Sequence, residues 1–155
     1  MTQPQVPTSA DLASGQNASE VMSAFSAQSV IPLVARMTSH PVMISGRDGS
    51  TVWVNDAFTR VSGWTLPEIA GKRPDQFLHG PATDADMARE ITRLTTAGQP
   101  FQAEIENYRK DGSRFWISLD AQPLIDPDGT VTGYFSVQSD ITDRKRIEVQ
   151  LRREH

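Results

Sequence analysis

The side chains best placed to bind a ligand in this sequence are amides rather than catalytic groups. After Pro100 the apolar residues recur with a period of two, which places Asn107 on the same strand face as Phe101 and Ile105. A buried amide needs hydrogen-bonding partners, so this pattern predicts a ligand beside Asn107, or else a partner from the backbone or water. The sequence contains no cysteine, which excludes disulfides, thiolate metal sites and cysteine nucleophiles.

The histidines and paired acids do not predict an enzyme. Neither His40 nor His79 has a second ligand at metal spacing, and the predicted helix at residues 84–96 contains no histidine. The acid pair Asp84 and Asp86 falls at the start of that helix, where capping explains it without catalysis. We therefore expect neither a metal site nor an active site, and we do not expect this chain to be an enzyme in its own right.

The overall composition limits the classes of function further. The 155 residues carry a formal net charge of −4, and no cluster of lysine and arginine precedes the last dozen positions. A nucleic-acid-binding surface is therefore not expected. No apolar run approaches the roughly 20 residues that cross a bilayer, and the N-terminus lacks the features of a signal peptide. We expect a cytoplasmic protein that makes no membrane contact.

The hydrophobic periodicity predicts strands at both ends of a helical middle. The predicted elements are strands at residues 42–44 and 51–54, short helices at 56–62 and 66–69, a longer helix at 84–96, and strands at 101–107, 114–124 and 131–141. This order predicts an α+β fold, with a five-stranded antiparallel sheet and short helices on one of its faces.

Four segments are predicted along the chain. Residues 1–18 have the composition of a disordered tail, and residues 19–37 have the spacing of a flanking amphipathic helix. Residues 38–142 form the predicted core. Residues 143–155 are strongly charged, with Ile147 and Leu151 as their apolar stripe, which suits either the first turns of a coiled coil or a solvated helix.

Six short motifs follow one another across the predicted core: Val54-Asn55-Asp56-Ala57-Phe58, Val61-Ser62-Gly63-Trp64, Phe77-Leu78-His79-Gly80-Pro81-Ala82-Thr83-Asp84, Asn107-Tyr108-Arg109-Lys110-Asp111-Gly112, Phe115-Trp116 and Val137-Gln138-Ser139-Asp140-Ile141-Thr142. In this order and spacing they resemble the PAS family and, within it, the light-oxygen-voltage (LOV) and related flavin-binding branch. The resemblance implies the PAS fold and a sensory role, with a flavin, FMN or FAD, as the cofactor.

The segment that carries the reactive cysteine of LOV domains departs from the family pattern here. The family's Gly-x-Asn-Cys-Arg-Phe-Leu-Gln becomes Gly71-Lys72-Arg73-Pro74-Asp75-Gln76-Phe77-Leu78-His79, which is one residue longer between Gly and Phe. Counted back from Phe77, Asp75 takes the place of the cysteine. A carboxylate cannot form the thiol adduct. The resemblance therefore implies non-covalent flavin binding, with Asp75, Gln76, Leu78 and His79 among the candidate cofactor-binding residues.

The arginines that meet the flavin phosphate in the family have no direct match. Gln76 takes the place of the first arginine. The place of the second falls on Thr92, with Arg93 next to it and Arg89 one turn before. The resemblance thus leaves the phosphate end of an FMN without its usual partners.

Two of the three amides that bond the flavin ring edge in LOV domains are present. The asparagine of the first long strand matches Asn107, that of the second is Ile117, and the glutamine of the last strand matches Gln138. The family register puts Gln138 on the inner face with Ser136, whose small side chain leaves space for a ring system. All four positions are therefore candidate cofactor-binding residues.

An alternative register of the last predicted strand, residues 131–141, follows from counting its apolar residues alone. It would turn Phe135 and Val137 inward and leave Gln138 facing water. We follow the family register, in which Phe135, Val137 and Trp116 form an apolar outer sheet face. Such a face must be covered, either by the predicted helix at residues 19–37 or by a second subunit, so we expect a homodimer.

Three functions stay open at this point. The first is a flavin-binding sensor for redox state or light that relays its signal through the C-terminal helix. The second is a cofactor-free PAS dimerisation module. The third is the input domain of a histidine kinase or a diguanylate cyclase, because PAS cores that end in Asp-Ile-Thr-Asp-Arg-Lys commonly precede such output domains.

Overall fold

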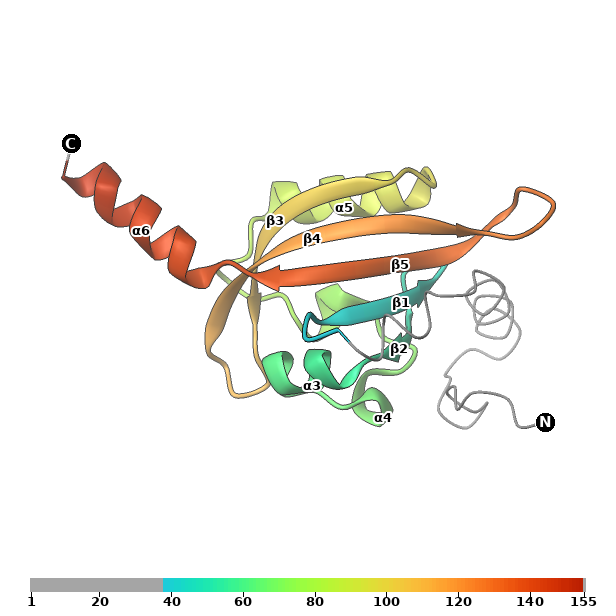
Figure 1. Cartoon of the computed structure of the whole chain (residues 1–155), viewed down its shortest axis with the longest axis horizontal. Coiled ribbons are helices and arrows are strands. Elements are labelled where there is room, and N and C mark those ends of the chain that lie inside the picture. Colours follow the sequence, from blue (N-terminus) through green and yellow to red (C-terminus); the bar gives the residue numbers. More distant parts are fainter. Residues whose placement is uncertain (1–37, 155) are drawn as a thin grey trace.

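The computed structural model describes residues 38–154, and in this part of the chain it confirms the α+β fold. Five strands form one antiparallel sheet in the order β2-β1-β5-β4-β3, and short helices lie against it (Figure 1). The predicted tail at 1–18 and the predicted helix at 19–37 lie outside the described residues.

Strand β5 holds the sheet together because it pairs with strands from both ends of the fold. The strands are β1 Val42–Gly46, β2 Thr51–Val54, β3 Phe101–Tyr108, β4 Arg114–Ile125 and β5 Val131–Asp140. On one side Val42 pairs with Val137, and on the other Leu119 pairs with Gln138. The central strand is therefore also the last one, and it leads directly into the C-terminal helix.

The register of β5 follows the family pattern rather than the apolar count. Tyr134, Ser136 and Gln138 are buried, whereas Phe135 and Val137 on the opposite face are only half-buried. The apolar count is wrong here because the inner face of this strand carries polar side chains that border a cavity rather than a dry core.

The helices are short, and their capping residues set where they begin. They are α3 Asp56–Ser62, α4 Leu66–Ile69, the 3-10 turn η1 Pro74–Gln76, α5 Ala85–Thr96 and α6 Thr142–Arg153. Asn55 caps α3, and its side-chain oxygen also accepts a hydrogen bond from the backbone N–H of Val42 at 2.9 Å. The same amide donates to the carbonyl of His40 at 3.0 Å. This one side chain therefore fixes α3 to the start of β1.

Two apolar clusters of the core border the cavity. The first contains Met43, Val54, Phe58, Ile69, Phe77 and Leu78. The second contains Ile105, Phe115 and Ile117, against which half-buried residues of α5 pack. No residue of α5 is fully buried, so this helix covers the sheet loosely and leaves a cavity behind it.

Candidate functional site

A cavity of about 210 Å³ lies between the inner face of the sheet, α5 and the η1 segment. Its apolar wall consists of Met43, Leu78, Ala88, Ile91, Phe101, Ile105, Ile117, Leu119, Ala121 and Tyr134. Protein interiors are close-packed and contain few voids larger than a water molecule. A mostly apolar space of this size with a few polar groups is typical of a site for a small organic ligand.

Two buried side-chain amides supply hydrogen-bonding groups to this otherwise apolar wall. Asn107 on β3 is 2% exposed, Gln138 on β5 is 4% exposed, and both line the cavity. The side-chain oxygen of Asn107 finds no hydrogen-bond partner among the described residues. A buried acceptor without a partner costs free energy, so its position at a cavity wall indicates a ligand that donates a hydrogen bond.

The third of the three positions predicted to bond the flavin ring edge carries an apolar residue. Ile117 on β4 is buried and lines the cavity, where it pairs with Ile105 of β3 and Asp140 of β5 across the sheet. Ser136 also lines the cavity, and its hydroxyl donates to the carbonyl of Met43 at 3.4 Å. The wall therefore offers two amides and one small hydroxyl, with an isoleucine where a third amide would add a hydrogen bond.

The segment from η1 to His79 places three of its four predicted site residues at the cavity. Asp75, Leu78 and His79 line it, and Leu78 is buried. Burial holds the pKa of His79 below its usual value, against the opposing charge of Asp75. Gln76 lies outside the cavity lining and is exposed, because its side-chain oxygen accepts a hydrogen bond from the backbone N–H of Arg73 and caps the turn.

Two arginines that were not among the predicted site residues also line the cavity. Arg47 comes from the turn between β1 and β2, and Arg73 comes from the segment before η1. Periodicity could not find them because loop residues have no fixed face. Thr92 also lines the cavity, but its neighbours Arg89 and Arg93 make ion pairs within α5, with Asp86 and Glu90.

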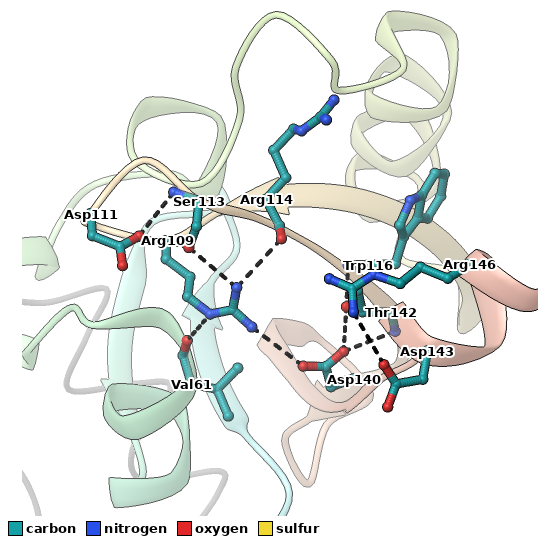
Figure 2. A network of polar contacts seen from close by, with 10 residues as sticks. All are labelled: Val61, Arg109, Asp111, Ser113, Arg114, Trp116, Asp140, Thr142, Asp143 and Arg146. Carbon is teal, nitrogen blue, oxygen red and sulfur yellow. Dashed lines mark hydrogen bonds and ion pairs between the residues drawn. The ribbon is translucent and has the colours of Figure 1, made fainter.

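A polar network connects the sheet beside the cavity to the start of α6 (Figure 2). Arg109 donates to the carbonyl of Val61 in α3 at 2.9 Å, and its guanidinium group lies 4.5 Å from the ring centre of Phe115. The same guanidinium lies 3.5 Å from a carboxylate oxygen of Asp140 at the end of β5. Arg109 therefore joins the helical layer to the last residue of β5, two positions before α6 begins.

Asp140 in turn fixes the first residue of α6. Its other oxygen accepts hydrogen bonds from the backbone N–H of Thr142 at 2.9 Å and from the Thr142 hydroxyl at 2.5 Å. The hydroxyl oxygen accepts from the backbone N–H of Trp116 on β4 at 3.0 Å. Lys145 lies 4.7 Å from the ring centre of Trp116. The first turn of α6 is thus attached to β4 and β5 by short polar contacts.

Comparison with known proteins agrees with this geometry. The sequence pattern of the PAS domain matches residues 39–143. The chain belongs to the PAS domain family. This PAS domain is 35% identical over 116 residues to a blue-light-activated histidine kinase of Rhizobium johnstonii, and 35% identical over 103 residues to the bacterioopsin transcriptional activator of Halobacterium salinarum. These matches cover 74% and 66% of the chain, respectively.

Solved LOV domains share the fold. A LOV domain studied with a flavin analogue superimposes with a TM-score of 0.69 at 27% identity, covering 81% of this chain and 94% of that one. The LOV domain of the blue-light-activated histidine kinase EL346 of Erythrobacter litoralis gives 0.62 at 25% identity, covering 66% of this chain and 96% of that one. The PAS domain is therefore a sensory module of the LOV-like branch.

The curated relatives are much longer than the region they share with this chain. The match spans 33% of the Rhizobium kinase and 15% of the Halobacterium activator. Within residues 38–154, no helix combines the length and apolar character needed to cross a membrane. In the same range, no three His, Cys, Asp or Glu side chains gather closely enough to hold a metal ion.

The unpartnered amide predicts opposite effects of one substitution at two buried asparagines. In the ligand-free protein, Asn107→Leu should raise the free energy of unfolding by about 1 kcal/mol, because it removes a buried acceptor that has no partner. The matched control Asn55→Leu should lower it by about 3 kcal/mol, because three backbone groups lose their partner. Urea denaturation measures both, and an equal loss at the two positions would show that Asn107 is satisfied without a ligand.

Proposed function

We propose that this PAS domain binds a flavin non-covalently in the cavity and reports the redox or light-excited state of that flavin through α6. The observation that carries the proposal is the buried side-chain oxygen of Asn107, which lines the cavity without a partner among the described residues. A flavin ring presents alternating carbonyl and N–H groups along one edge. Amides can donate to and accept from such an edge, which suits Asn107 and Gln138.

The remaining residues of the wall support a flavin that stays non-covalent. Asp75 lines the cavity where LOV domains carry their cysteine, and the sequence contains no cysteine at all. When bound, a flavin would supply blue-light absorption and electron transfer. The role of this chain is to hold the ring with Asn107, Gln138 and Ser136, with Leu78 and His79 at the same wall, and to exclude water with the apolar lining.

The names of the relatives point in the same direction. Two histidine kinases that match this chain are described as blue-light-activated, and one solved neighbour is described together with a flavin analogue. We therefore propose that this domain is the input part of a signalling protein, with a kinase or cyclase as the output. We further propose that residues 38–142 are the sensory core and that residues 143–155 are the linker to the output.

We also propose that the active form is a homodimer. On α6 the side chains of Ile147 and Leu151 are exposed, four residues apart, on a helix that projects away from the sheet (Figure 1). That spacing suits a helix-to-helix contact between two copies. The predicted helix at residues 19–37, expected to cover the outer face of the sheet, lies outside the described residues.

Flavin binding is tested by absorption and by affinity. Freshly purified protein should be yellow and should release a flavin on denaturation. Riboflavin added to stripped protein should bind about tenfold more weakly to Asn107→Leu, because one ring-edge hydrogen bond is lost, and about tenfold more tightly to Ile117→Asn, because one is gained. The exposed Gln102→Leu on the outer face of β3 is the matched control and should bind like the wild type.

Two outcomes would contradict the proposed flavin site. If the purified protein is colourless and stripped protein binds no riboflavin at micromolar concentration, the cavity is not a flavin site. The cofactor-free dimerisation module would then describe this domain better. If all three variants bind riboflavin like the wild type, the ligand lies elsewhere and the amides are not its partners.

The route to α6 predicts a separation of binding from signalling. Gln138 and Asp140 lie two residues apart on the same face of β5, and Asp140 fixes the start of α6. In flavin-loaded protein, Gln138→Leu should keep the ligand but lose the change in hydrogen exchange across residues 142–153 that blue light or reduction causes in the wild type. Asp140→Asn is the control and should raise exchange there in both states. A light response of Gln138→Leu equal to that of the wild type would place the coupling elsewhere.

A further inference from the structure

The polar end of the cavity contains two arginines that belong to neither of the family's phosphate-binding positions. We propose that Arg47 and Arg73 together bind the phosphate of the cofactor, so that this domain takes a phosphorylated flavin and holds its anionic end from the β1–β2 side of the cavity. This inference rests on the proposed flavin site and adds the selectivity of that site.

The first support is that the arginines near the family's phosphate-binding positions do not line the cavity, whereas Arg47 and Arg73 do. The side chains of Arg89 and Arg93 are mostly exposed, make ion pairs with Asp86 and Glu90 within α5, and are absent from the cavity lining. Gln76 caps the backbone of η1 and lies outside the lining. The residues that replace or flank the usual phosphate ligands therefore do not provide an anion site.

The second support is that Arg47 is held at the cavity with donors to spare. One terminal nitrogen of its guanidinium donates to the carbonyl of Val131, at the start of β5, at 3.1 Å. A guanidinium has five N–H donors in a plane, which suits the oxygens of a phosphate. Arg47 lines the cavity, so the remaining donors are available at its polar end.

The third support is that the segment that carries Arg73 is hydrogen-bonded to the β1–β2 hairpin, which carries Arg47. The backbone of this segment is fixed to β2, because the N–H of Thr51 donates to the carbonyl of Lys72 and the N–H of Gly71 donates to the carbonyl of Thr51, both at 2.9 Å. The side chain of Arg73 lies over the β1–β2 turn, where its Cδ would be 3.7 Å from a Cβ at Gly49. Both arginines therefore lie at the β1–β2 turn, Arg47 as part of it and Arg73 on a segment hydrogen-bonded to β2.

The length of β5 matches a ligand with a ring at one end and an anion at the other. Val131, which binds Arg47, precedes Gln138 by seven residues on this strand. At about 3.3 Å per residue the two positions are roughly 23 Å apart. Long side chains reach inward from both ends, and a ring alone would not connect them. A flavin whose sugar-alcohol chain ends in a phosphate has the required form.

Two carboxylates, of Asp48 and Asp75, lie at the same end of the cavity and compete with a phosphate for the arginines, but they do not prevent phosphate binding. Asp48 accepts hydrogen bonds from the N–H and hydroxyl of Ser50 at 3.0 and 2.6 Å. Asp75 pairs with Arg73 at 3.2 Å, and both of these side chains are more than half exposed. An exposed ion pair contributes little to stability, so a doubly charged phosphate can compete for Arg73. His79 and Tyr134 also line the cavity; burial lowers the pKa of His79 and raises the pKa of Tyr134, so that both stay uncharged and neither competes for the arginines.

Affinities for riboflavin and FMN, which differ by the phosphate, test the proposal on the full chain stripped of cofactor. The wild type should bind FMN about tenfold to a hundredfold more tightly than riboflavin, and added salt should reduce this preference. The double variant Arg47→Gln/Arg73→Gln should lose the preference and keep its riboflavin affinity, which also shows that it is folded. The matched control Arg89→Gln/Arg93→Gln should keep the preference.

Three results would overturn the proposal, and they are distinguishable. If the wild type binds riboflavin and FMN equally, the proposed flavin site stands and the phosphate site does not. If the control pair loses the preference while the Arg47/Arg73 variant keeps it, the phosphate lies at α5. If neither flavin binds the wild type, the proposed function itself fails, and the phosphate site fails with it.

Discussion

The cost of burying an amide in an apolar wall determines how this site works. Asn107 is almost fully buried beside Ile105 and Phe115, and its oxygen lacks a partner among the described residues. Asn55, also buried, makes every hydrogen bond that its position requires and serves the fold. Two asparagines of similar burial thus have different roles, because one is satisfied by the chain and the other borders a cavity.

Strand β5 connects the cavity to the start of α6. Its inner face carries Ser136 and Gln138 at the cavity, and its last residue, Asp140, fixes α6 and pairs with Arg109. Arg109 follows Asn107 by two residues and comes directly after the end of β3. β5 therefore ends at one member of an ion pair, and the other member directly follows the end of β3. A ligand that moves either strand end would act on the same junction, which gives a short route from binding to helix α6.

The sequence was sufficient for the fold and for the inner face of the sheet, but not for the loops. Alternation placed Asn107 correctly, and the motif order placed Gln138 correctly where apolar counting failed. Gln76 lies outside the cavity lining because its side chain caps a turn, which its position in the motif could not reveal. Arg47 and Arg73 could not be assigned to the cavity from the sequence because turn residues follow no period. Their approach to one cavity depends on backbone hydrogen bonds between distant segments.

The side-chain amide signals of Asn107 and Gln138 provide the most direct test of the central claim that these two groups meet the ligand. In nitrogen-labelled protein, the NH₂ resonances can be assigned by their loss in Asn107→Leu and Gln138→Leu. Adding riboflavin should shift both pairs of signals and leave the NH₂ signals of Asn55 in place. If riboflavin binds while the signals of Asn107 and Gln138 stay unchanged, the ligand does not contact these amides and the account of the site is wrong.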